Sequence, residues 1–138
     1  MEKIVVTEFV SLDGVMEASG GGEDFKHAGW TFKINRGEEG DQFKLDETRE
    51  TEALLLGRVT YEGFAAAWPS QKGEFADKFN SMPKYVVSST LEKPEWNNSM
   101  VLKGAVVEEV YRLRQRLGGN IVVHGSAPKR SNWDGRCA

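Results

Sequence analysis

The sequence has few of the residues from which redox-active or metal-binding sites are built. Its 138 residues include one cysteine, Cys137, and two histidines, His27 and His124. A single cysteine cannot form an internal disulfide, and its place next to the last residue argues against a catalytic role. Neither histidine has Cys or His partners at the spacing of zinc ligands. We therefore expect a protein without a metal site.

Long apolar runs and clustered positive charge are also missing. No stretch approaches the roughly 18 apolar residues of a membrane span, and the N-terminus lacks the charged-then-apolar layout of a signal peptide. The net charge is −3, whereas nucleic-acid-binding surfaces collect Lys and Arg. These absences predict a cytoplasmic protein of one domain, with neither a membrane nor a nucleic acid as partner.

The residues that are present alternate between strand and helix patterns. Short runs rich in Val, Ile and Leu predict strands at residues 3–10, 53–57, 84–89 and 120–125. Three of these runs lack polar alternation, which favours a parallel sheet covered by helices on both faces. Helices are expected at residues 38–53, 60–68 and 106–117. The alternation predicts an α/β fold.

Residues 11–37 interrupt this alternation. The segment carries six glycines and has neither a helical nor a strand period. We expect a long loop, and long loops inside compact domains tend to be functional. A loop without a function would give the same pattern.

The segment LLLGRVTYEGF, residues 54–64, has the chemistry of an anion site. An apolar strand ends at Gly57, Arg58 follows at once, and Thr60 stands where the helix is expected to begin. A helix N-terminus offers unpaired N–H groups, and a guanidinium suits phosphate. Thr60 could also cap the helix. A plain strand-to-helix turn with a solvated arginine is the alternative interpretation.

Small polar residues follow two other expected strands. Ser88, Ser89 and Thr90 come after the third, and Gly125 and Ser126 come at the end of the fourth. Ligands of open α/β sheets bind beyond the carboxyl ends of the strands, so these residues could line a nucleotide. They could equally serve only as turn formers. The G-x-G-x-x-G fingerprint of dinucleotide-binding folds does not follow the first strand.

Taken in order and spacing, five segments resemble the dihydrofolate-reductase-like superfamily: EFVSLDGVMEA, ALLLGRVTYEGFAAAWP, FNSMPKYVVSSTLE, WNNS and VVHGS. The chain looks most similar to small bacterial proteins that resemble the reductase domain of the bifunctional riboflavin-biosynthesis deaminase-reductase. The resemblance covers residues 2–127. It implies a three-layer α/β/α fold with a mainly parallel central sheet, and NADPH-dependent reduction of a pterin, a pyrimidine or a related heterocycle.

The resemblance also implies cofactor-binding residues. The adenosine-side phosphates of NADPH would lie on Gly57, Arg58 and Thr60. Ser88 and Ser89, with Thr90 adjacent, would lie along the adenine ribose and its 2′-phosphate. Gly125 and Ser126 would accept the pyrophosphate.

Substrate-side residues follow from the same resemblance. Contacts to nicotinamide and substrate would come from Val10, Asp13, Gly14 and Met16, and Trp30 would be a wall of the pocket. Asp41 matches the acidic residue of the reductases by its distance from Gly57, and Asp13 is a second candidate for the proton donor. An Asp near a helix N-terminus could instead be only a partner of the helix dipole.

The end of the chain departs from the family pattern. Family members continue past the glycine turn with a helix and further strands. The segment APKRSNWDGRCA has neither the helical nor the strand period of apolar residues. We therefore expect an incomplete domain at residues 1–127, truncated at its C-terminus, followed by an atypical tail at 128–138. The first strand would become an open sheet edge, which favours a homodimer. The second interpretation of function is accordingly a nonenzymatic, truncated fold that dimerises and binds nucleotide weakly or not at all.

Overall fold

The computed structural model describes residues 3–22 and 24–125 of the chain, so the expected tail and Ser126 lie outside the described residues. In chain order the elements are β1 (Ile4–Thr7), the 3₁₀ helix η1 (Trp30–Lys33), α1 (Gly37–Arg49), β2 (Thr51–Gly57), α2 (Arg58–Ala67), the 3₁₀ helix η2 (Trp68–Ser70), α3 (Glu74–Ser81), β3 (Lys84–Val87), β4 (Ser99–Leu102), α4 (Val106–Arg116) and β5 (Asn120–His124).

One five-stranded sheet in the order β1-β5-β2-β3-β4 forms the centre of the molecule. All of its strand pairs are parallel, which confirms the parallel sheet expected from the sequence. Val122 of β5 lies between Val5 of β1 and Leu54 of β2 in the register. Because the strands are parallel, their carboxyl ends meet at one edge of the sheet, where ligands of such folds bind.

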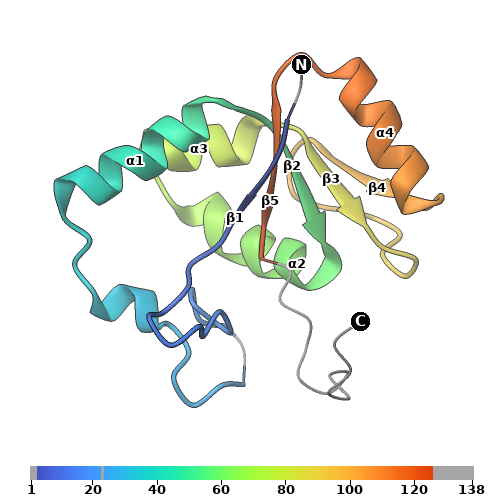
Figure 1. Ribbon diagram of the computed structural model, residues 1–138. Helices are drawn as coiled ribbons and strands as arrows, with labels where there is room; N and C mark the ends of the chain where they lie inside the picture. The colour runs from blue at the N-terminus through green and yellow to red at the C-terminus, as the bar shows by residue number, and fades with distance from the viewer. Residues whose placement is uncertain (1–2, 23, 126–138) are drawn as a thin grey trace.

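Helices cover both faces of the sheet and make the three layers that the sequence predicts (Figure 1). On one face, Leu54, Leu56 and Val122 pack with Tyr61 of α2 and Phe79 of α3. On the other face, a second cluster contains Ala53, Tyr85, Leu102, Leu113 of α4 and Ile121. Full burial of each large apolar side chain stabilises the fold by about 1.5–3 kcal/mol.

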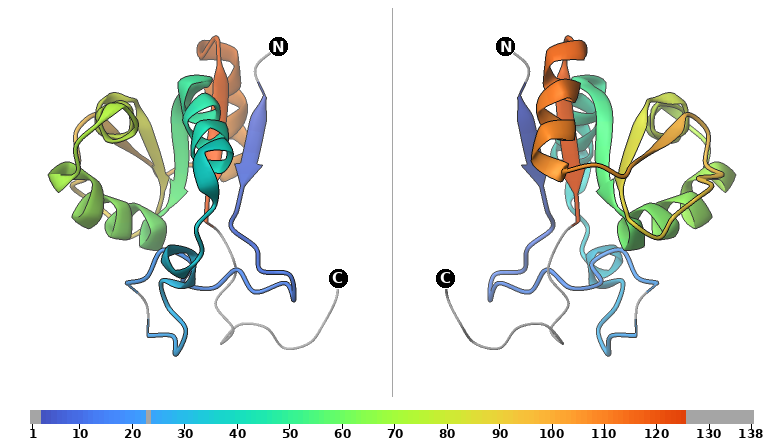
Figure 2. Two further views of the ribbon diagram at one scale, coloured as in Figure 1. Left: turned by 90° about the vertical axis from the view of Figure 1, so that its left-hand side faces the viewer. Right: turned by 90° about the vertical axis from the view of Figure 1, so that its right-hand side faces the viewer.

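The β1 strand forms one edge of the sheet, as both views in Figure 2 show. Val5 packs against the cluster on the α2 and α3 face. Alternate residues of a strand point to opposite faces, so Ile4 and Val6 point to the other face. They are 41% and 66% exposed. The open apolar edge expected from the sequence is therefore present in the described part of the chain.

Two helix boundaries differ from the expectation. The helix expected at 38–53 ends at Arg49, and residues from Thr51 onward belong to β2, where Thr51 is buried. The helix expected at 60–68 begins at Arg58. Local pattern does not fix such boundaries, because strand pairing competes with helix propensity for the same residues.

Two short elements were not expected from the sequence. Helix α3 has only eight residues, and its buried face consists chiefly of Ala76 and Phe79. Strand β4 has four residues, of which Leu102 alone is buried. Elements this short give little periodic signal. The long loop at residues 11–37 is confirmed, with η1 as its one regular element among the described residues.

Candidate functional site

An open cleft of about 420 Å³ lies at the carboxyl ends of β2, β3 and β4. It is lined by Arg58, Val87, Ser88, Ser89, Thr90, Leu102, Lys103, Gly104 and Val106. The sheet thus brings together four residues that sequence reasoning assigned to the cofactor, although they are separated by up to 32 positions in the chain: Arg58, Ser88, Ser89 and Thr90. The cleft combines apolar walls with convergent polar groups, which is the usual composition of a ligand site.

Two cations line this cleft. Arg58 is the first residue of α2, and its Nη1 lies 2.9 Å from Glu62 Oε2. Lys103 follows β4 directly and is exposed, and no carboxylate of the described residues forms an ion pair with it. Sequence reasoning missed Lys103 because it did not predict β4. Two cations beside three hydroxyl groups favour an anionic ligand such as a phosphate.

Ser88 has the role of a turn former and also lines the cleft. Its Oγ accepts hydrogen bonds from the backbone N–H of Thr90 at 3.2 Å and of Leu91 at 2.9 Å. The Oγ atoms of Ser88 and Thr90 are 3.4 Å apart. The turn therefore presents Ser89 and Thr90, both exposed, at the mouth of the cleft. The turn is thus confirmed, and contact of this serine segment with a nucleotide stays a prediction.

Gly125 and Thr60 lie against each other where β5 ends beside α2. A Cβ on Gly125 would be only 2.6 Å from Thr60 Oγ1, and the φ of Gly125 is +69°. Both facts require glycine at this position. The close approach at this glycine is made by Thr60. The predicted contact of Gly125 with a pyrophosphate stays a prediction. The neighbouring Ser126 lies outside the described residues.

Thr60 does not cap α2. The N-cap is Gly57, with φ −76° and ψ 162°, and it makes no side-chain capping bond. Thr60 is the third residue of the helix because α2 begins two residues earlier than the sequence suggested. The first N–H groups of α2 therefore have no side-chain cap, which leaves them available to an anion near Arg58.

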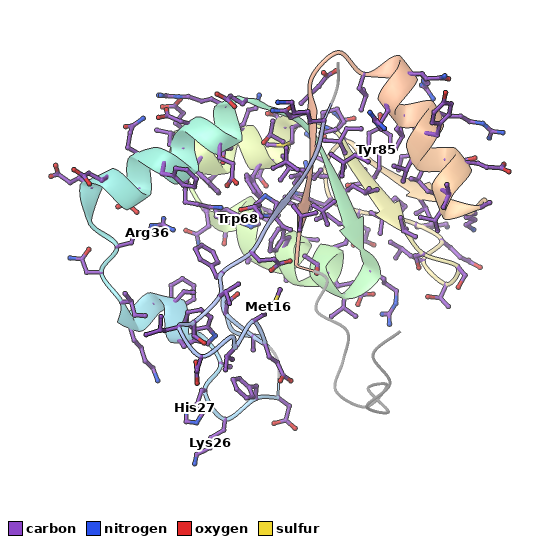
Figure 3. The ribbon with its side chains drawn as sticks, in the orientation of Figure 1. Met16, Lys26, His27, Arg36, Trp68 and Tyr85 are labelled. Atoms are coloured by element: carbon purple, nitrogen blue, oxygen red, sulfur yellow. The ribbon has the colours of Figure 1, made fainter. Side chains whose placement is uncertain are left out.

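The substrate-side residues of the sequence prediction lie in or beside the long loop. Val10 is 54% exposed, and Asp13 accepts a hydrogen bond from Ser11 Oγ at 2.5 Å. Gly14 has φ +86°, and Trp30 Nε1 donates to Glu17 O at 3.2 Å. Figure 3 shows Met16 on the part of this loop closer to the sheet. None of these residues lines the cleft.

Asp41 lies on the exposed surface of α1. It accepts a hydrogen bond from Arg36 Nε, and the side chains of Arg36 and Asp41 are 48% and 68% exposed. Figure 3 shows Arg36 near the end of α1 that points away from the strands. The structure does not bring Asp41 to the cleft, and its role as proton donor stays a prediction.

A cluster of charged and polar side chains at the carboxyl ends of β1 and β5 was not found by sequence reasoning. Lys44 of α1 donates to Thr7 Oγ1 at 3.0 Å and forms an ion pair with Glu47, and both charged side chains are less than 20% exposed. Burial and, to a smaller extent, the charge of Lys44 together lower the pKa of His124 to about 4, against the opposing charge of Glu47. Hydrogen bonds from Lys44 and Thr7 lower the pKa of Glu47 against the opposing effect of burial. Titratable groups with perturbed pKa values often gather at functional sites.

Clusters of metal-ligating side chains and membrane-spanning helices are both absent from residues 3–22 and 24–125. No three His, Cys, Asp or Glu side chains there are grouped as metal ligands would be. No helix in that part of the chain has the length and apolar character needed to cross a membrane.

A parallel sheet with a cleft at its carboxyl edge has the arrangement of α/β domains that bind ligands at that edge. Comparison with known families is more specific, because the model of the RibD C-terminal domain matches residues 2–128. The chain therefore belongs to the RibD C-terminal domain family. A comparison with curated proteins found no significant match.

A solved structure supports the same fold. The chain is similar to a crystal structure from Shewanella sp. PV-4, of a protein provisionally assigned to riboflavin biosynthesis, with a TM-score of 0.63 and 20% sequence identity. The match covers 91% of this chain and 65% of the Shewanella chain. The chain thus spans about two thirds of the length of that relative. At this identity the likeness concerns the fold, and it confirms the dihydrofolate-reductase-like architecture expected from the sequence.

Proposed function

We propose that the chain is an NADPH-dependent reductase of the RibD C-terminal type, acting on a pterin, a pyrimidine or a related heterocycle in riboflavin biosynthesis. The observation that carries this proposal is the cleft in which Arg58, Lys103 and the hydroxyls of Ser88, Ser89 and Thr90 converge. Family membership supports a reductase, and the two cations support a phosphorylated nucleotide as its cofactor.

The residues of the cleft fit the adenosine end of NADPH. Val87, Leu102 and Val106 provide apolar contact for adenine, while Arg58 and Lys103 would hold phosphate. Gly125, which follows β5 at the same edge of the sheet, would lie along the pyrophosphate. NADPH would supply the hydride when bound, and the chain would contribute binding, orientation and exclusion of water.

The position of the cleft also supports a location for the other end of a dinucleotide. Neighbouring strands lie about 4.8 Å apart, so a cofactor that extends along the carboxyl edge from β3 would pass β2 and reach β5 and β1. That end of the edge holds the cluster of charged and polar side chains Thr7, Lys44, Glu47 and His124. We infer that the substrate binds near this cluster, and Asp41 and Asp13 stay the predicted proton donors.

Titration with NADPH, followed by its fluorescence, tests the proposal. The Arg58→Ala variant should weaken NADPH binding about tenfold, because a hydrogen bond to a charged group contributes about 1.5–3 kcal/mol. Arg49→Ala is the matched control, since Arg49 pairs with Glu74 on the surface between α1 and α3. If Arg58→Ala loses more affinity for NADPH than for NADH, Arg58 contacts the 2′-phosphate. An equal loss of affinity for both cofactors would indicate that it contacts the pyrophosphate. Absence of NADPH binding by the unmodified protein would contradict the proposal.

The β1 edge favours the second candidate function, a nonenzymatic fold that dimerises and binds nucleotide weakly or not at all. Ile4 and Val6 present an exposed apolar surface on a strand whose outer edge is open among the described residues. We propose a homodimer through this edge under either function. Sedimentation at micromolar concentration should show a dimer that Val6→Lys converts to monomer. Val107→Lys is the control, because Val107 is 83% exposed on α4. A stable unmodified monomer would rule out this dimer.

We propose a small-molecule substrate and a cytoplasmic location. The net charge of −3 supports a small-molecule partner over a nucleic acid.

A further inference from the structure

The two cations of the cleft differ in what they contact. Arg58 Nη1 lies 2.9 Å from Glu62 Oε2 and 3.1 Å from Glu62 Oε1, one helical turn further along α2. Lys103, from the other side of the cleft, has no ion-pair partner in residues 3–22 and 24–125. Only one of the two positive charges is therefore free to meet an incoming anion.

Glu62 and Arg58 are placed for exchange of partners. Their side chains are 51% and 44% exposed, so the ion pair is in contact with solvent. Exposed ion pairs at this spacing are weak, so another anion can replace the carboxylate. Glu62 itself does not line the cleft.

We propose that Glu62 is an internal competitor for Arg58, and that it makes the cleft selective for a dianionic phosphate monoester. This inference rests on the proposed function, because it concerns the same cleft. A monoester phosphate carries more charge than the carboxylate that it displaces, so the exchange at Arg58 is favourable. A ligand with a single negative charge gains little from the same exchange. An uncharged ligand gains nothing.

Calorimetric titration with adenosine 2′,5′-bisphosphate, and with adenosine as the uncharged probe, tests this inference. Glu62→Gln should tighten binding of the bisphosphate about two- to fivefold and leave adenosine binding unchanged. The gain should decrease as salt is added, because screening weakens interactions between exposed charges. In an Arg58→Ala background, Glu62→Gln should bring no comparable gain.

Glu74→Gln is the matched control variant. Glu74 also pairs with an arginine on the surface, Arg49 at 2.7 Å, and the substitution removes the same charge from the protein. It should not change bisphosphate binding. An equal gain in bisphosphate affinity in Glu74→Gln would overturn the inference, because the effect would then come from net charge. An equal gain from Glu62→Gln in the Arg58→Ala background would also overturn it, because Glu62 would then repel the ligand directly.

Failure of the inference can be distinguished from failure of the proposed function. If the unmodified protein binds the bisphosphate and Glu62→Gln binds it equally well, Glu62 is not a competitor for Arg58. Weaker binding by Glu62→Gln would show instead that Glu62 orients Arg58. The proposed function then survives without the inference. If no variant binds the bisphosphate while circular dichroism shows all of them folded, both are overturned.

Discussion

Thr60 and Gly125 meet where the end of β5 passes the first turn of α2. A Cβ on Gly125 would lie 2.6 Å from Thr60 Oγ1 and 3.2 Å from Thr60 Cγ2. The φ of Gly125 is +69°, in the left-handed region that other residues rarely adopt. The close contact and the backbone conformation thus impose the same requirement for glycine.

Replacing Gly125 by alanine should therefore destabilise the fold and weaken NADPH binding together. We expect a loss of about 1–3 kcal/mol in the free energy of unfolding, from backbone strain and from the clash with Thr60. Urea denaturation measures this loss. Gly63→Ala is the control, because a Cβ there meets nothing within 4 Å, and alanine in a helix stabilises by up to about 1 kcal/mol.

A second substitution separates the two causes. Thr60→Ala removes both side-chain atoms that lie closest to the added Cβ, while the φ of Gly125 stays unchanged. The double variant should therefore recover part of the loss caused by Gly125→Ala. A Gly125→Ala protein as stable as the unmodified one would show that neither the contact nor the φ matters.

The sequence predicted the parts of this site that follow long apolar strands. Arg58 and Gly125 follow β2 and β5, whose apolar runs are recognisable without a structure. Lys103 was missed because β4 has four residues and only Leu102 is buried. The Lys44–Glu47 pair was missed for a different reason. Its proximity to Thr7 and His124 depends on how α1 packs on the sheet, which no local pattern encodes.

Stability should depend on pH through His124. Burial lowers the pKa of this imidazole from 6.5 to about 4. As the pH falls below 6.5, the unfolded chain takes up a proton that the folded protein does not, so the free energy of unfolding decreases. The contribution of His124 is fully present above pH 6.5, and about 3 kcal/mol of it is lost by pH 4. Urea denaturation between pH 7 and 5 measures this slope.

His124→Phe is the variant that isolates this effect. The ring of His124 lies 5.9 Å from that of Phe64 and 5.4 Å from that of Phe79, so phenylalanine suits the surroundings. The variant should show a flatter pH dependence above pH 5. Glu8, whose pKa burial raises, would add stability on acidification and so opposes the effect of His124. An unchanged slope in His124→Phe would exclude His124 as the cause.

Lys84 should stabilise the fold although its charge is buried. The residue is 0% exposed, and its Nζ donates to Asn80 O and Asn97 O, both at 2.8 Å. Lys84→Met relieves the burial of a charge but leaves Asn97 O without its donor, whereas Asn80 O keeps a hydrogen bond from Asn97 Nδ2 at 3.1 Å. A hydrogen bond from a charged donor contributes about 1.5–3 kcal/mol, and relief of the buried charge offsets part of this loss, so we expect a net loss of about 1–2 kcal/mol. The exposed Lys72, replaced by methionine, is the control.

The same comparison at high pH tests whether the buried amine is charged. Burial lowers the pKa of Lys84 from 10.5 to about 8. Between pH 8 and 10.5 the unfolded chain holds a proton that the folded protein has lost, so the free energy of unfolding of the unmodified protein rises with pH. A neutral amine still donates to both carbonyls. The difference in stability between the unmodified protein and Lys84→Met should therefore widen as the pH rises through this range, and a constant difference would contradict the lowered pKa.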